Sequence, residues 1–62
     1  MELWIARDES GGLYVYRGKP DRSGISFEPQ HDGDFMRLPD DYYPEVTWGN
    51  SPQRLVLNNE KQ

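Results

Sequence analysis

The sequence predicts an all-β fold, an antiparallel meander or half-open barrel of four to five short strands. Apolar residues alternate with period two in short runs, and turn-forming residues separate these runs at intervals of about 8–12 residues. No ten-residue stretch has helical apolar spacing without a proline or glycine. With 62 residues, 34% of them hydrophobic, the chain has material for one small domain. We assign residues 1–57 to this domain and expect the polar residues 58–62 to fray.

The first 17 residues predict a β-hairpin. Alternating aliphatic and aromatic or small side chains occupy residues 3–6, and the same alternation returns at residues 13–16. Between them, residues 8–12 end in two glycines, which adopt the positive φ that a short hairpin loop needs. We therefore expect either Gly11 or Gly12 to have a positive φ.

A second hairpin is predicted farther along the chain. Residues 18–24 are turn formers and charged residues, so they predict a loop. Residues 25–27 then predict a short strand, and residues 35–38 predict its return strand. The Asp32-Gly33 pair between them is typical of a tight turn.

Pro39 begins the next predicted element, one short helical (3-10) turn over residues 39–43. Proline suits the first helical position, and the carboxylates of Asp40 and Asp41 suit the positive end of the helix dipole. Pro44 then ends the turn. The remaining predicted elements are an extended segment at residues 45–48 and a last strand at residues 54–57.

Two motifs carry a resemblance to known proteins. Near its beginning, the chain reads Trp4-Ile5-Ala6-Arg7-Asp8, followed by Gly12-Leu13-Tyr14. Later, residues 35–38 lead into Tyr43-Pro44-Glu45-Val46-Thr47-Trp48. This pattern resembles a class of very short bacterial and phage-type all-β proteins, with an aromatic-Ile-Ala-Arg-Asp start and an aromatic-Pro-Glu-Val-Thr-Trp end. The resemblance covers residues 3–57 and implies the same domain boundaries. It suggests a phage or mobile-element origin, and no known activity is attached to the class.

Residues for catalysis or metal binding are sparse. The chain has no cysteine, and its one histidine, His31, lies among acids in a predicted turn, so no nucleophile with a positioned base is visible. Glu28, Asp32 and Asp34 are close in sequence but lack the full pattern of a calcium loop. We therefore expect no metal, no cofactor and no enzymatic activity.

The charge is acidic and unevenly distributed. Eleven acidic residues against seven basic ones give a net charge of −4, and residues 28–45 alone carry −5. Such a chain is a poor binder of a nucleic-acid backbone, which requires a basic surface. No signal peptide and no apolar run of membrane-spanning length are visible, so we expect a cytoplasmic protein without membrane contact.

Aromatic residues make up 13% of the chain, and alternation places Trp4, Tyr14 and Tyr16 on one face of the first hairpin. The opposite face is aliphatic, so the sheet is apolar on both sides. Either the aromatic face binds a partner, or it is a second core. The candidates to cover it are Tyr42, Tyr43, Pro44 and Trp48. We expect burial for Trp4 and solvent-exposed hydroxyl groups for Tyr14 and Tyr16.

The leading functional hypothesis is a non-enzymatic protein–protein binding or adaptor module. Its predicted surface consists of Trp4, Tyr14 and Tyr16, with Asp40 and Asp41 as an acidic rim. Its partner is another protein, and the chain itself is a monomer or a weak edge-strand dimer. The alternative is an acidic inhibitor that mimics nucleic acid and occupies the basic groove of an enzyme.

Overall fold

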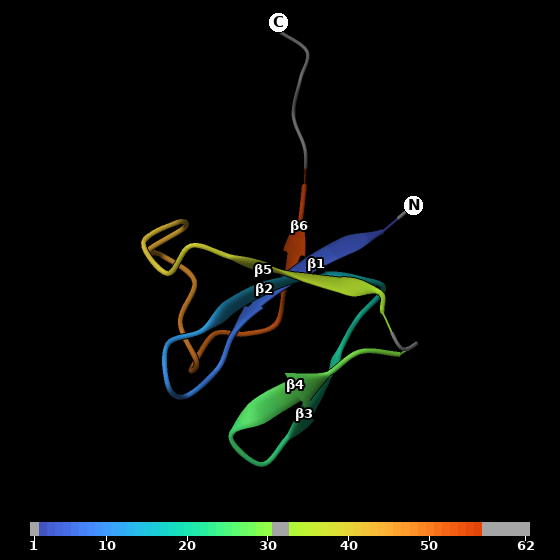
Figure 1. Ribbon diagram of the computed structural model, residues 1–62, viewed down its shortest axis with the longest axis horizontal. Helices are drawn as coiled ribbons and strands as arrows, with labels where there is room; N and C mark the ends of the chain where they lie inside the picture. The colour runs from blue at the N-terminus through green and yellow to red at the C-terminus, as the bar shows by residue number, and fades with distance from the viewer. Residues whose placement is uncertain (1, 31–32, 57–62) are drawn as a thin grey trace, which may run out of the picture.

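The computed structural model describes residues 2–30 and 33–56, and it confirms the all-β fold. Its six strands are β1 (Leu3–Arg7), β2 (Leu13–Arg17), β3 (Asp21–Ser23), β4 (Ser26–Glu28), β5 (Phe35–Leu38) and β6 (Gln53–Leu55). Four of them form an antiparallel sheet in the order β5-β2-β1-β6, and β3 and β4 form a separate two-stranded sheet beside it (Figure 1). The larger sheet is not closed into a barrel, and the described residues contain no helix.

The first hairpin is confirmed. Strands β1 and β2 pair antiparallel from Leu3↔Arg17 to Arg7↔Leu13. The loop between them is closed by two backbone hydrogen bonds, from the Asp8 N–H to the Gly12 carbonyl (2.8 Å) and from the Gly11 N–H to the Asp8 carbonyl (2.9 Å). Gly11 has a φ of 103°, so it is the glycine that the loop conformation requires.

We expect the Gly11→Val variant to be destabilised by about 1–2 kcal/mol, because a β-branched residue is strained at positive φ. A Cβ at this position meets no atom within 4 Å, so the cost comes from the backbone and not from a clash. The free energy of unfolding, measured by urea titration, checks this. An unchanged midpoint would contradict the assigned role of Gly11.

The predicted second hairpin is wrong. Strand β4 pairs with β3, which lies within the predicted 18–24 loop, and β5 pairs with β2 instead of β4. The strand expected at residues 25–27 begins one residue later, because Ile25 belongs to the β3–β4 turn. Strand β3 is Asp-Arg-Ser, whose three residues are all exposed and have no apolar alternation, so only its pairing with β4 makes it a strand. The predicted turn residues His31 and Asp32 lie outside the described residues.

Residues 39–48 agree with the prediction only in part. The short turn expected at residues 39–43 is present as one hydrogen-bonded turn, closed from the Tyr42 N–H to the Pro39 carbonyl (3.1 Å), and it does not extend into a helix. The segment expected to be extended at residues 45–48 is not a strand, because turns occupy residues 44–45 and 48–50 and only residues 46–47 lie between them. Residue 46 is buried among turns because its valine side chain packs into the core.

The last predicted strand is present as β6, one residue earlier than expected, and its predicted end, Leu57, lies outside the described residues. It pairs antiparallel with β1, in the register Leu3↔Leu55 and Ile5↔Gln53. Next in this register, the Arg7 N–H donates to the Ser51 hydroxyl at 2.9 Å. The Ser51 side chain thus accepts the next hydrogen bond of the β1–β6 pairing, in place of the backbone carbonyl of residue 51.

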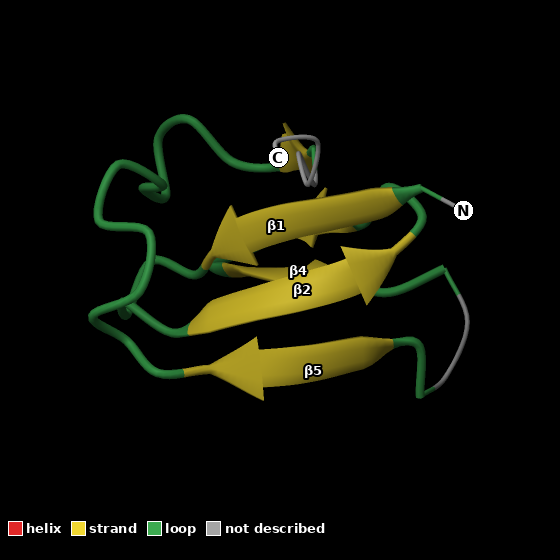
Figure 2. Cartoon of the chain, turned by 90° about the horizontal axis from the view of Figure 1, so that it is seen from above, coloured by secondary structure: helices red, strands yellow, loops and turns green. Residues whose placement is uncertain are grey.

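The four-stranded sheet has an apolar core on each face. On one face, Val46 covers Ile5 and Leu13, with the half-buried Val15, Leu38 and Leu55 packed around them. On the other face, Phe27 of β4 covers Ala6 and Tyr16, and the half-buried Trp4, Tyr14 and Trp48 surround them. Figure 2 shows β1, β2 and β5 side by side, with β4 behind them. The β3–β4 hairpin therefore acts as the second layer of the fold.

Candidate functional site

The structure places the predicted aromatic residues together, but in a covered position. Trp4↔Tyr16 and Ala6↔Tyr14 are register partners, so Trp4, Tyr14 and Tyr16 do share one face. That face is the second core, and Tyr16 is only 3% exposed. The expected exposure of the Tyr16 hydroxyl is therefore wrong, because the β3–β4 hairpin covers this ring. Trp4 and Tyr14 are half-buried.

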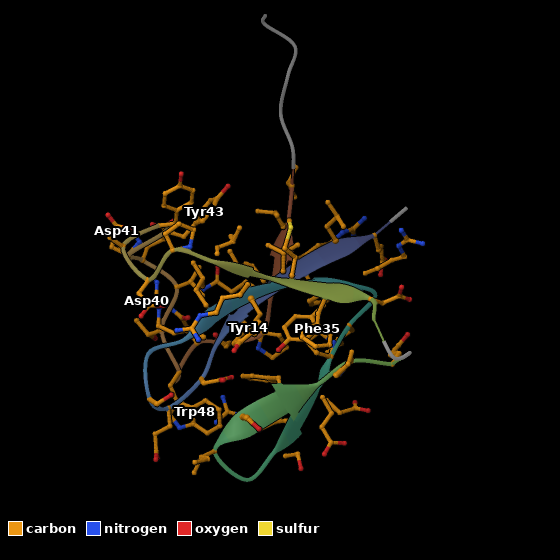
Figure 3. The ribbon with its side chains drawn as sticks, viewed as in Figure 1. Tyr14, Phe35, Asp40, Asp41, Tyr43 and Trp48 are labelled. Atoms are coloured by element: carbon orange, nitrogen blue, oxygen red, sulfur yellow. The ribbon has the colours of Figure 1, made fainter. Side chains whose placement is uncertain are left out.

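The side chains that cover this face differ from those expected. Trp48 packs against it, as the sequence suggested, but its companion is Phe27, whose ring centroid lies 5.5 Å from that of Trp48. Tyr42, Tyr43 and Pro44 are exposed instead. Figure 3 shows Tyr14 and Phe35 between the sheet and the β3–β4 hairpin, Trp48 beside the hairpin, and Asp40, Asp41 and Tyr43 on a loop at one end.

Arg22 joins the hairpin to the rest of the molecule. Its guanidinium carbon lies 3.8 Å from the Trp48 ring centroid, within the range of a cation–π contact. The same side chain donates to the carbonyls of Trp48 (2.7 Å) and Ser51 (3.0 Å). Arg22 thus connects the exposed strand β3 to the turn that carries Trp48, so it helps to close the aromatic core.

Arg7 organises the exposed loop of residues 40–45. Its five guanidinium N–H donors have five acceptors, all of them backbone carbonyls, at 2.6–3.2 Å. These carbonyls belong to Gly11, Asp40, Tyr42, Tyr43 and Val46. One half-buried side chain therefore fixes the backbone of the loop at several points and attaches it to the first hairpin.

The 40–45 loop (Asp40, Asp41, Tyr42, Tyr43, Pro44 and Glu45) is exposed along its whole length. Tyr42 is 52% and Tyr43 37% exposed, and Tyr43 has a φ of 48°, which is uncommon for a residue other than glycine. Asp40 forms an ion pair with Arg37, at 3.1 Å between Oδ1 and Nη2. The loop thus presents aromatic and acidic side chains from a backbone that Arg7 holds in place.

A second cluster of polar side chains lies beside the aromatic core, where Asp8, Tyr14, Tyr16 and Arg37 interact electrostatically. Burial raises the pKa of the Asp8 carboxyl, while the charge of Arg37 and a backbone hydrogen bond from Phe27 act in the opposite direction. Its Oδ1 atom is buried and has no hydrogen-bond partner among the described residues. The pKa of Tyr16 is raised to about 12. The largest cause is burial, followed by the charge of Asp8 and by the interaction with Tyr14.

We expect the Asp8→Asn variant to alter the pH dependence of stability. Because the pKa of Asp8 is raised in the folded protein, its favourable contribution is present below the unfolded pKa of about 3.9 and is lost as the pH rises through the folded pKa. Relative to the unaltered chain, the variant should therefore gain stability between about pH 3 and pH 7. Urea midpoints at both pH values measure this, and a difference that stays constant would contradict it.

Arg7 and Arg22, the two arginines that organise the structure, are not among the site residues that the sequence predicts. Arg7 ends the first strand, at the position where alternation brings its side chain onto the aliphatic face beside Leu13. A charged residue at a core-facing position is the signal that indicates a role for Arg7. For Arg22 no such signal exists. Its acceptors are backbone carbonyls 26 and 29 residues farther along the chain, and these come close to Arg22 only in the folded structure.

Comparison with known proteins gives no relative, since no family model, no curated protein and no solved structure matches the chain. Within residues 2–30 and 33–56, no group of three or more acidic or histidine side chains is arranged to hold a metal ion. The candidate ligand Asp32 and the single histidine lie outside these residues. The same part of the chain contains no helix of the length and apolarity that a membrane crossing needs. The 40–45 loop, exposed along its length and attached to Arg7 by three hydrogen bonds, is the candidate binding surface.

Proposed function

We propose that the protein is a non-enzymatic binding module that recognises another protein through the 40–45 loop. The observation that carries the proposal is the set of hydrogen bonds from Arg7 to the carbonyls of Asp40, Tyr42 and Tyr43. A loop whose backbone is already ordered loses less conformational entropy on binding. Tyrosine suits such a surface, because it supplies a large contact area with few rotatable bonds.

The chemistry of the loop defines the partner. Asp41 and Glu45 are exposed carboxylates on either side of Tyr42 and Tyr43, and the described structure shows no ion pair for either of them. A complementary surface is basic and has an apolar pocket for a tyrosine ring. Asp40 and Asp41, the predicted acidic rim, thus remain part of the proposed surface, while Tyr42 and Tyr43 replace the buried Tyr16 as aromatic anchors.

We expect the Tyr42→Ala variant to weaken capture of the partner by about 2 kcal/mol, the usual cost of truncating an interface anchor. Its stability should change by less than about 0.5 kcal/mol, because the ring is half exposed. The measurement is capture of the same protein from a lysate of the source organism by the immobilised chain, followed by its affinity for each variant.

The matched control is Ile25→Ser, since Ile25 is 63% exposed on the β3–β4 turn, away from the loop. Equal loss of binding in both variants, or no loss for Tyr42→Ala, would contradict the proposal.

The salt dependence of partner affinity distinguishes the proposed function from the nucleic-acid mimic that the acidic segment suggested. A mimic should lose affinity steeply between low and high ionic strength and should be more sensitive to Asp41→Asn than to Tyr42→Ala.

A further inference from the structure

Strand β5 forms an edge of the four-stranded sheet, and no strand of the described structure pairs with its outer side (Figure 2). An unpaired edge presents backbone donors and acceptors to any other strand. Natural edge strands are usually protected by lysine, proline or a bulge. Strand β5 is Phe-Met-Arg-Leu, with neither lysine nor proline, and its only charged residue is Arg37.

The register determines which backbone groups of β5 point outward. The Arg17 N–H donates to the Asp34 carbonyl at 2.9 Å, so residues 34, 36 and 38 are those that exchange hydrogen bonds with β2. The N–H and C=O groups of Phe35 and Arg37 consequently point away from the sheet. Among the described residues, none of these groups has a hydrogen bond to a side chain or loop.

The side chains of this edge are also available. Phe35 is 46% and Met36 is 62% exposed. Phe35 and Arg37 lie on the aromatic face, as the register partners of Tyr16 and Tyr14, whereas Met36 lies on the aliphatic face beside Val15. An apolar edge with two free pairs of backbone groups is a site for the addition of a strand.

We propose that a second copy of this chain occupies the edge, with the two β5 strands antiparallel across a twofold axis at Met36. In this register, Phe35 is opposite the partner's Arg37 in both directions, so every outward N–H and C=O group of the two residues is paired. The proposal concerns a surface other than the 40–45 loop and does not depend on the proposed function.

The outward groups of β5 pair completely with those of a second β5 strand, and they do so only in this register. If Phe35 were opposite the partner's Phe35, the Arg37 groups would reach Gly33, outside the strand. If Arg37 were opposite the partner's Arg37, like charges would meet directly, and Phe35 would be opposite Pro39, which has no N–H. In the proposed register, each Arg37 guanidinium lies beside the partner's Phe35 ring, as it already lies beside its own Tyr14 ring at 5.5 Å.

Single cysteines test the register, because the natural chain contains none. Directly opposed residues have Cβ atoms about 4.5–5.5 Å apart, so Met36→Cys should form a disulfide-linked dimer about tenfold faster than a control cysteine. The control is Ile25→Cys, whose site is equally exposed but lies on the β3–β4 turn. Equal rates would overturn the proposal. Faster crosslinking of Phe35→Cys or Arg37→Cys than of Met36→Cys would overturn the register.

A non-covalent measurement makes the test independent of the cysteines. By sedimentation equilibrium, the wild-type chain should show a monomer–dimer equilibrium. A wild-type chain that stays monomeric up to a concentration of about 1 mM would overturn the proposal. Arg37→Pro removes an outward N–H but no hydrogen bond to β2, so it should abolish the dimer, whereas Arg37→Lys should retain it. An Arg37→Pro variant that dimerises like the wild type overturns the proposal. If this variant is unfolded by circular dichroism, the Met36→Cys result decides.

Discussion

The Arg7→Ala variant is expected to lose at least about 3 kcal/mol of stability, most of what a domain of this size possesses. The substitution removes the Arg7 donor from five backbone carbonyls, of which that of Tyr43 keeps a second donor, the Val46 N–H at 2.9 Å. The contacts to the Gly11 and Val46 carbonyls are part-buried. The loss of several charge-assisted hydrogen bonds adds to the desolvation cost of carbonyls that stay unpaired. Urea unfolding, followed by the fluorescence of Trp4 and Trp48, measures the change.

Two further arginine variants show whether geometry or charge accounts for this effect. Arg7→Lys keeps the charge but has no planar set of five donors, so it should recover only a minor part of the stability. Arg54→Ala is the control, since the side chain of Arg54 is 63% exposed and its nearest acidic partner, Glu2, is 4.0 Å away. It should cost less than about 0.5 kcal/mol. If Arg7→Lys is as stable as the wild type, the hydrogen bonds of Arg7 do not hold the loop.

The second large effect is expected for Tyr16→Ser, at about 3 kcal/mol or more. Tyr16 is 3% exposed between the sheet and Phe27, and truncating a buried aromatic ring removes apolar contacts and leaves a cavity. Its ring centroid is also 6.3 Å from that of Tyr14 and 6.0 Å from that of Phe35, so both rings lose a neighbour. The free energy of unfolding from urea titration gives the value.

Tyr14→Ser is the matched variant, because it alters the same residue type on the same face and strand. Tyr14 is half-buried, so its substitution should cost less than that of Tyr16. Tyr16→Phe keeps the ring and should retain most of the stability. Were Tyr16→Ser as stable as the wild type but deficient in partner capture, the aromatic face would be a binding surface, as one reading of the sequence allows, and not a second core.

The two proposed surfaces are separable by experiment. Tyr42 lies on the 40–45 loop, and Met36 and Arg37 lie on β5, so variants of one surface leave the other intact, apart from the ion pair between Arg37 and Asp40. A chain that dimerises through β5 would present two copies of the 40–45 loop. Two linked copies bind a repeated or dimeric partner more tightly than one copy does, provided that the geometry permits both contacts.

The fold class and the first hairpin are predictable from the sequence because the information for them is local. Alternation over a few residues determines that Trp4 and Tyr16 share a face, and one glycine determines where the chain reverses. Both strands of this hairpin and its loop lie within 15 residues, from Leu3 to Arg17. No distant segment is needed to specify it.

The partners of the other strands depend on the tertiary structure. Strands β4 and β5 looked like one hairpin, since each has an aromatic residue and an Asp-Gly pair lies between them. Instead, β5 extends the sheet beside β2, where Leu38 and Met36 continue the aliphatic face. Strand β4 pairs with the polar strand β3, which brings Phe27 over Tyr16. Both arrangements bury more apolar surface than an isolated hairpin, and only the assembled chain makes that burial available.

By itself, the sequence therefore determined the class of fold, the position of the first hairpin and of its loop, and the fact that this hairpin is apolar on both faces. Only the tertiary structure decided which face is exposed. It placed Phe27 and Trp48 over the aromatic side and left Tyr42 and Tyr43 in solvent. It also brought the Arg7 guanidinium to carbonyls more than 30 residues away. The physical reason is that burial and backbone hydrogen bonding depend on distances in space, which local alternation does not encode.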